Sequence, residues 1–377
     1  MPGITRAHVS DVRGAGRMLV DASTGVVDVV ERMHRTIQRR PAPVGAPVED
    51  ATRGITGFVY RSIRGGMQLV GRGLDASLAP LEGLLPAGGS TPGRDAFIAI
   101  VNGVYGDYLV RTGNPLAIEM RLLGGTAPTG KLLVFVHGLC MSDQHWAHQG
   151  ASPATALADS LGYTPLYLRY NSGRPVADNG REFAARLEAL LEDWPVAVDE
   201  LAIVGHSMGG LVARSACVAG EENRHRWRRK LARLVFLGTP HHGAPLERGG
   251  HGLDFLLELS PYSAPFTRIG KARSAGIRDL RHGTITHGRH RSAALPRGVD
   301  CYAIAATLGE RRGVMADHLV GDGLVPVASA LGQHADRSRA LRIPTAHRWV
   351  AHRMGHLELL RRPEVYARLQ GWLADRA

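Results

Sequence analysis

The sequence predicts an α/β fold in which a mostly parallel central sheet is covered by helices on both faces. From about residue 115 onward, short apolar runs alternate with segments of helical periodicity, a pattern typical of strand–helix units around a parallel sheet. Within that alternation, a strand-like run passes through Gly205-His206-Ser207-Met208-Gly209 directly into a helix-like run. A turn this tight leaves little room for side chains two residues before and after the serine.

The first 95 residues differ from the rest, and we expect them to form an N-terminal helical extension that carries no recognisable motif. Pro- and Gly-rich stretches at 41–47 and 88–93 are typical of linkers. Apolar residues recur there at helical spacing on two stripes, the second of which is interrupted by glycines that lower helix propensity. The stripes consist of Val26, Val30, Met33 and Ile37, and of Met67, Val70, Leu74, Leu78, Leu81 and Leu85. Such helices can pack on the rest of the chain, dimerise or lie on a lipid surface.

Residues 96–377 are predicted to form one α/β domain. An amphipathic helix between Phe97 and Tyr108 leads into it, and a period-two run from Leu116 to Leu122 suits an antiparallel strand at the sheet edge. Buried parallel strands are expected at five short apolar runs, with helices between them, for example at 182–191 and 211–218. The five runs are Lys131 to Val136, Tyr163 to Tyr170, Leu201 to Val204, Leu231 to Leu237 and Val299 to Ala306.

The alternation breaks down between about 241 and 298. This interval holds one apolar run and then a stretch rich in arginine, glycine and histidine. We expect a lid-like insertion there.

The charge balance does not indicate a nucleic-acid partner. The chain has a formal net charge of +12 and a pI near 10.2. Only three lysines occur, so the excess is almost entirely arginine, spread along the whole chain. No recognisable module and no basic cluster with interleaved aromatic residues is present. We interpret the densest basic run, 224–230, as a solvated helix face that could also favour an anionic membrane surface.

The remaining composition is typical of a cytoplasmic protein without cofactors. The three cysteines, Cys140, Cys217 and Cys301, show neither metal-ligand spacing nor a disulfide framework, which favours a reducing compartment. The N-terminus lacks the apolar core of a secretory signal, and no apolar run reaches the roughly 18 residues of a membrane span. There is no glycine-rich phosphate loop, and we expect no metal. Peripheral membrane association stays open, as does the oligomeric state.

The tight turn predicts a nucleophilic serine. Its geometry lifts the Ser207 hydroxyl clear of the sheet, at a helix N-terminus that favours negative charge. A serine hydroxyl needs a base to take its proton, and in this arrangement an acidic residue and then a histidine follow the serine along the chain. Asp322, between two glycines, is the expected acid, with Asp317 and Asp300 as alternatives.

Three histidines near the C-terminus compete for the role of base. His347 and His352 lie in or near the expected last strand, whereas His356 lies in the turn beyond it. We favour His356, followed by His352, because side chains in that turn can reach the serine. The aspartate would hold the imidazole in the required tautomer and stabilise its cation.

Main-chain donors for a developing oxyanion are also predicted. The run from Leu132 to Val136 is followed by His137-Gly138-Leu139, which matches a turn that supplies one backbone N–H, here from Leu139. The second N–H would come from Met208, the residue after the nucleophile. We interpret His137 itself as structural.

Taken together, these motifs resemble those of α/β-hydrolase superfamily lipases and esterases, and in particular of GPI-inositol deacylase-like lipases. Four segments and His356 carry the resemblance, over residues 137 to 356. The segments are His137-Gly138-Leu139, Gly205 to Arg214, Gly238-Thr239-Pro240-His241-His242-Gly243-Ala244-Pro245, and Gly321 to Pro326. The resemblance implies an α/β-hydrolase fold, a triad of Ser207, Asp322 and His356, and hydrolysis of carboxylic esters through an acyl-enzyme.

The expected substrate is a small-molecule or lipid ester, and the protein would take part in lipid metabolism. Glycolipid anchors do not follow as substrates, because many plain lipases share these motifs. Two alternatives stay open: acyl transfer to an alcohol by the same triad, and a non-catalytic, membrane-associated scaffold that retains the fold. The segment Tyr170-Asn171-Ser172-Gly173 either contacts substrate or forms a simple turn.

Overall fold

The computed structural model describes residues 6–39, 54–84, 92–146, 152–244, 274–287, 294–310 and 321–374. The chain divides into two compact units. One consists of Met1–Thr91 with Thr112–Leu116, and the other of Pro92–Arg111 with Ala117–Ala377.

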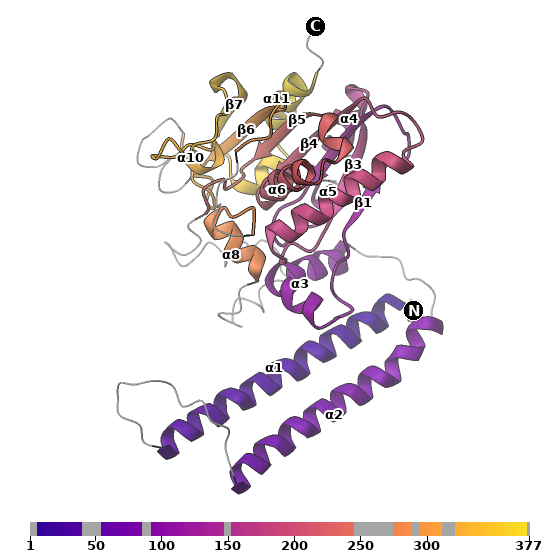
Figure 1. The fold of residues 1–377 in the computed structure, drawn as a ribbon, viewed down its shortest axis with the longest axis vertical. Coiled ribbons are helices and arrows are strands. Elements are labelled where there is room, and N and C mark those ends of the chain that lie inside the picture. Colours follow the sequence, from indigo (N-terminus) through magenta and orange to yellow (C-terminus); the bar gives the residue numbers. More distant parts are fainter. Residues whose placement is uncertain are drawn as a thin grey trace. The chain divides into compact units, whose positions relative to one another are not determined.

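The second unit is built on a seven-stranded sheet in the order β1-β3-β2-β4-β5-β6-β7 (Figure 1). All neighbouring strands are parallel except β1, which pairs with β3 in the antiparallel sense. The strands are β1 (Arg121–Gly124), β2 (Lys131–Val136), β3 (Thr164–Arg169), β4 (Glu200–His206), β5 (Leu231–Leu237), β6 (Asp300–Thr307) and β7 (Arg348–His352). The predicted fold class, a mostly parallel sheet within an α/β fold, is confirmed.

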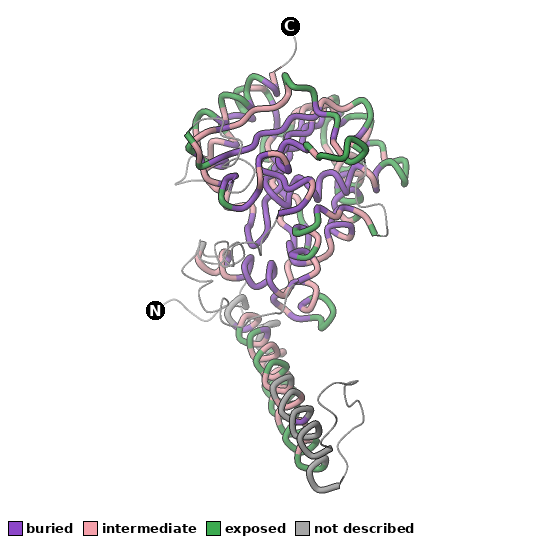
Figure 2. The backbone as a smooth tube through the Cα atoms, turned by 90° about the vertical axis from the view of Figure 1, so that its left-hand side faces the viewer, coloured by how far each residue is buried: buried purple, intermediate pink, exposed green. Residues whose placement is uncertain are grey.

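Helices cover both faces of this sheet, as the burial of β2 shows. Leu132 and Val134 belong to one apolar cluster, and Leu133 and Phe135 belong to a second one, because successive side chains of a strand point to opposite faces. The first cluster includes α3 (Pro92–Arg111), α5 (Val176–Asp193), α6 (Met208–Glu222) and α8 (Ala275–His282). The second includes α4 (Pro153–Ser160) and α11 (Pro363–Leu373). Figure 2 shows the buried backbone concentrated in the strands between these layers.

Short helical turns complete this unit. They are η1 (Asp143–Trp146), η2 (Arg226–Arg229), α10 (Val327–Ala330), η4 (Thr345–His347) and η5 (His356–Leu360).

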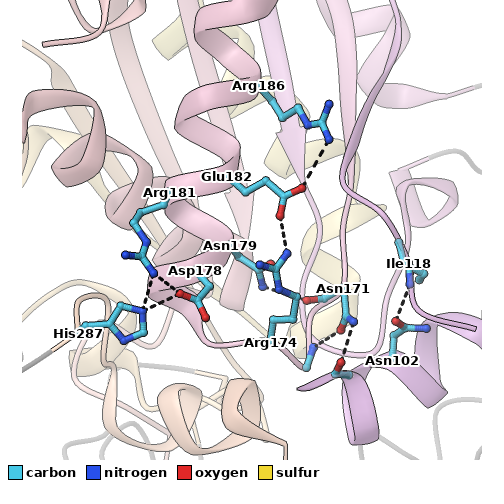
Figure 3. A network of polar contacts seen from close by, with 12 residues as sticks. Asn102, Ile118, Asn171, Arg174, Asp178, Asn179, Arg181, Glu182, Arg186 and His287 are labelled. Atoms are coloured by element: carbon cyan, nitrogen blue, oxygen red, sulfur yellow. Dashed lines mark hydrogen bonds and ion pairs between the residues drawn. The ribbon is translucent and has the colours of Figure 1, made fainter. Parts of the chain in front are cut away.

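The edge strand begins later than its alternating pattern predicts. β1 covers Arg121–Gly124, whereas the pattern begins at Leu116. The backbone N–H of Ile118 donates instead to the side-chain Oδ1 of Asn102 on α3, at 2.9 Å (Figure 3). A side chain therefore replaces a strand partner for this part of the run.

Part of the interval expected to be an insertion belongs to the core. Helix α8 lies within 241–298, and its Ile277 and Leu280 are each 3 % exposed in the same cluster as α5 and α6. Residues 245–273 and 288–293 lie outside the described part, and with them most of the expected lid.

The first unit contains two long antiparallel helices, α1 (Arg6–Arg39) and α2 (Gly54–Leu84), which lie side by side (Figures 1 and 2). A Cβ on Gly71 of α2 would lie 2.9 Å from Val20 of α1, so the glycine permits the close approach. Asp75 of α2 accepts hydrogen bonds from Arg17 and Arg13 of α1, and these two guanidinium groups lower the pKa of Asp75 to about 2. None of the described helices is long and apolar enough to cross a membrane.

Candidate active site

Ser207 lies in a strained turn between β4 and α6. Its φ of 53° and ψ of −124° lie where L-residues are rarely found, and such strain persists only where the surroundings impose it. The Ser207 N–H donates to the carbonyl of Leu237 at the end of β5, at 2.8 Å. The serine is therefore held at the carboxyl edge of two neighbouring parallel strands, and its residue is 5 % exposed.

The glycines around the serine are required by close backbone contacts. A Cβ on Gly205 would lie 2.6 Å from the Cα of Gly210, and a Cβ on Gly209 would lie 2.6 Å from the carbonyl oxygen of His137. A Cβ on Gly210 would lie 2.8 Å from Cγ2 of Thr239. The turn folds back on itself so tightly that each of these positions excludes a side chain.

Asp322 is a buried carboxylate held by its own turn. Its Oδ1 accepts hydrogen bonds from the backbone N–H groups of Leu324 at 3.0 Å and of Val325 at 2.8 Å. Gly321 and Gly323 on either side have φ values of 49° and 95°, the left-handed region that glycine adopts without strain. The turn therefore fixes one carboxylate oxygen and leaves Oδ2 to face a partner.

That partner is His356, the first residue of η5. Nδ1 of His356 lies 2.6 Å from Oδ2 of Asp322, and both side chains are 1 % exposed. Nε2 of the same ring is buried and has no hydrogen-bond partner among the described residues. A Cβ on Gly238, the residue after β5, would lie 3.0 Å from Cε1 of His356. The imidazole therefore lies beside the strand end whose carbonyl binds the Ser207 N–H.

The structure places two of the alternatives, Asp300 and His347, away from the pair of Asp322 and His356. Asp300 and His347 lie at the opposite, amino edge of the sheet, where Nδ1 of His347 bonds to the carbonyl of Cys301 at 3.2 Å. His352 ends β7, and its residue pairs with Thr307 in the register of the sheet. Asp317 lies outside the described residues. Within the described part of the chain, His356 and Asp322 are the base and acid that a hydrogen bond joins.

The expected oxyanion donors come from adjacent strand ends. Leu139 follows β2 and Met208 follows β4, and the last paired residues of these strands are Val136 and Gly205. A Cβ on Gly138 would lie 3.1 Å from Cβ of Ser207, so the loop that carries Leu139 passes directly over the serine.

A polar turn after β3 supports that loop. The Cys140 N–H donates to Oγ of Ser172 at 3.1 Å, and Asn171 accepts from the Gly173 N–H through Oδ1, also at 3.1 Å. Asn179 of α5 donates to the carbonyl of Asn171 at 2.9 Å (Figure 3). The segment 170–173 is thus a buried turn that braces the loop after β2. The sequence left open whether this segment was a turn or a substrate contact. The available signal for a bracing turn was an asparagine and a serine directly after a buried strand.

His137 also supports the loop. Its Nδ1 lies 2.9 Å from the carbonyl of Gly138, its ring stacks on Tyr170 with centroids 4.3 Å apart, and the Tyr170 hydroxyl donates to the His137 carbonyl at 2.8 Å. Burial lowers the pKa of His137 to about 4, so the ring is neutral.

No group of three or more His, Cys, Asp or Glu side chains that could hold a metal ion occurs within the described ranges.

Comparison with known proteins gives one family match and several similar structures. A family model described as a domain of unknown function, DUF7379, matches residues 117–261. No curated protein sequence matches the chain.

The structure is similar to that of a Bacillus licheniformis lipase in its mature form. Sequence identity is 20 %, the TM-score is 0.46, and the match covers 68 % of this chain and 98 % of the lipase. A thermophilic esterase from Thermogutta terrifontis gives 17 % identity and a TM-score of 0.40, with 68 % and 93 % covered. A lipase-esterase related protein from Clostridium acetobutylicum gives 12 % identity and a TM-score of 0.38, with 67 % and 98 % covered.

Proposed function

We propose that the protein is a serine hydrolase that cleaves carboxylic esters, with Ser207, His356 and Asp322 as its triad. The observation that carries the proposal is the buried pair of His356 and Asp322, joined at 2.6 Å beside the strand end that holds Ser207. Because Asp322 occupies Nδ1 of the imidazole, the other nitrogen, Nε2, is the one available to a serine hydroxyl.

The proposed reaction begins when Nε2 of His356 removes the proton from the Ser207 hydroxyl as Oγ attacks the acyl carbon. Asp322 stabilises the imidazolium that forms. Collapse of the tetrahedral intermediate breaks the bond to the leaving alcohol, which takes the proton from His356. A water molecule then repeats the sequence on the acyl-enzyme and releases the carboxylic acid.

The tetrahedral intermediate carries a negative oxygen, and we assign its stabilisation to the backbone N–H groups of Leu139 and Met208. Met208 is the first residue of α6, so the positive end of that helix adds to the field at the oxyanion. The loop bearing Leu139 is braced by Ser172, which limits the reorganisation needed during the reaction.

The fold and the triad do not determine which acyl chain or head group is bound, so the proposed activity is ester hydrolysis in general. A chain-length series of p-nitrophenyl esters, with and without detergent, separates an esterase for soluble esters from an interface-activated lipase. Turnover of long-chain esters only above their solubility limit would show that the enzyme is an interface-activated lipase.

Peripheral membrane association is a second proposal, and the outer face of α2 favours it. Phe58, Leu69 and Val70 are 65 %, 73 % and 71 % exposed, and at 3.6 residues per turn they fall within about a third of the helix circumference. Exposed Arg61 and Arg72 border that side. An apolar face with a basic border fits an anionic lipid surface. The basic run at 224–230 fits less well, because ion pairs with acidic side chains engage part of its charge.

The nucleophile is tested by labelling with a fluorophosphonate. Wild type should be labelled and Ser207→Ala should not, while Ser338→Ala, at an exposed serine, should be labelled like wild type. Asp322→Asn should retain the fold and lower kcat by about 10⁴-fold, because the imidazole loses its tautomer. Equal labelling of wild type and Ser207→Ala would reject Ser207 as the nucleophile.

A further inference from the structure

We infer that His206, the residue before the nucleophile, is a positioning residue that fixes the main chain of the base. The inference rests on the proposed function, since it concerns how His356 is held toward Ser207. The carrying observation is that Nε2 of His206 lies 3.1 Å from the carbonyl oxygen of His356, across 150 residues of sequence. The motif treats this position as variable, and the proposed mechanism uses only its neighbour.

The hydrogen bond is wholly buried and its direction is defined. His206 is 0 % exposed and His356 is 2 % exposed. A carbonyl oxygen can only accept, so Nε2 of His206 carries the hydrogen and Nδ1 carries the lone pair. Burial lowers the pKa of His206 well below its usual range, and positive charge on His356 lowers it further. The ring therefore stays a neutral donor while the proposed base cycles through its cation.

With this bond, His356 is fixed on three sides. Its N–H donates to the carbonyl of Asp322 at 3.2 Å, its Nδ1 bonds the Asp322 carboxylate, and its carbonyl accepts from His206. The two bonds to Asp322 tie the residue to the turn before α10. The bond from His206 ties it to β4, one residue before the nucleophile.

His206 therefore connects the nucleophile to the base through few bonds. The path runs from Ser207 along one peptide bond to His206, through one hydrogen bond to the His356 backbone, and from there to its ring. The two imidazole rings contact each other, with centroids 4.7 Å apart. A Cβ on Gly138 would lie 3.2 Å from Nδ1 of His206, so the loop bearing Leu139 packs against the same ring. One side chain thus sets the spacing between nucleophile, base and oxyanion loop.

Such spacing matters because proton transfer requires Nε2 and Oγ to lie within about 3 Å of each other. A displacement of about 1 Å can lower a rate by about 100-fold. Removing the donor should therefore lower kcat with little effect on KM, because a fully buried side chain is out of reach of a substrate.

Three substitutions test the role. His206→Gln places an amide N–H near the position of Nε2, His206→Asn has the same group one methylene shorter, and His206→Met fills the space without a donor. We expect Gln to retain kcat within about fivefold of wild type for p-nitrophenyl butyrate. Asn and Met should lose about 10- to 100-fold, with KM changed less than threefold in every variant. Circular dichroism and urea unfolding identify any variant that fails to fold.

The outcomes separate this inference from the proposed function. If wild type shows no hydrolysis and labels no better than Ser207→Ala, the proposed function itself fails. If wild type is active and Met equals it, or Gln is as impaired as Asn, His206 only fills space and the positioning role is rejected. The Gln and Asn pair decides the question even if the Met variant does not fold.

Discussion

At the scale of single residues, we expect the glycines of the turn to tolerate substitution as poorly as the proposed catalytic groups do. Gly209→Ala would place a methyl group 2.6 Å from the carbonyl oxygen of His137, which is main chain and cannot swing aside. We expect a loss of about 1–3 kcal/mol in the free energy of unfolding, together with lower activity, because β2 and α6 must move apart. Urea unfolding measures the first and ester turnover the second.

Gly371→Ala provides the matched control. Gly371 lies inside α11, and a Cβ there would meet nothing within 4 Å. Alanine should raise stability by about 0.5–1 kcal/mol through its better helix propensity. Should Gly209→Ala be as stable as wild type, the close approach of α6 to β2 would not constrain this position.

Residue order along the chain predicted the pair of Asp322 and His356, because a tight turn around a serine implies an acid and then a histidine downstream. Sequence favoured His356 over His352, only four positions earlier, because side chains in the turn beyond the last strand can reach the serine. That choice depends on the end of β7 at His352 and on the turn into η5, which brings residue 356 back to the Asp322 carboxylate. The bond from His206 was missed because it joins two segments 150 residues apart.

At the scale of elements, apolar runs predicted the interior strands closely. β2 and β5 have the bounds that their apolar runs predicted, since parallel strands buried on both faces carry little polar sequence. The edge strand was placed too early, because Asn102 takes over a backbone hydrogen bond that periodicity assigns to a neighbouring strand. The alternation of apolar and polar residues does not show that a side chain from another element takes the place of a neighbouring strand.

The two N-terminal helices make contacts with each other that their apolar stripes did not predict. Glycines weaken the helix propensity of α2, yet Gly71 allows α1 to approach, and ion pairs to Asp75 join the two helices. Val70 and Leu74, which belong to the predicted stripe, are 71 % and 43 % exposed. The side chains of the predicted stripe on α1, from Val26 to Ile37, lie outside the described set. An exposed apolar stripe on a paired helix is a candidate contact surface.

If the outer face of α2, with Phe58, Leu69 and Val70, binds lipid, polar substitution there should release the protein from vesicles. We expect full-length protein to sediment with vesicles of phosphatidylcholine and phosphatidylglycerol, and the double variant Leu69→Ser, Val70→Ser to stay in the supernatant. Val196→Ser, at a 41 % exposed site in the other unit, is the control and should sediment like wild type. Turnover of a short soluble ester should be equal in all three.

Sedimentation of the double variant with vesicles would reject this face as the lipid contact. A dimer of the wild type that the double variant loses, without vesicle binding by either, would assign the face to a second copy of the chain. Light scattering coupled to gel filtration distinguishes these outcomes.

At the scale of the whole molecule, three buried, neutral histidines link stability to pH. Burial lowers the pKa of His137 to about 4 and those of His206 and His241 well below the usual value. In the unfolded chain these imidazoles bind protons near pH 6.5. Between about pH 6.5 and 4 the unfolded state therefore holds more protons than the folded state, and stability falls as the pH falls.

For His137 alone, the difference between about 6.5 and about 4 corresponds to roughly 3 kcal/mol at the acid end of that window. Urea unfolding at intervals from pH 7.5 to 4.5 should show this decline, and His137→Asn should make it shallower. Asparagine retains an N–H near the position of Nδ1 for the Gly138 carbonyl, but it does not titrate. An identical slope in His137→Asn and wild type would mean that His137 binds its proton equally well in the folded and unfolded states, contrary to its burial beneath the loop.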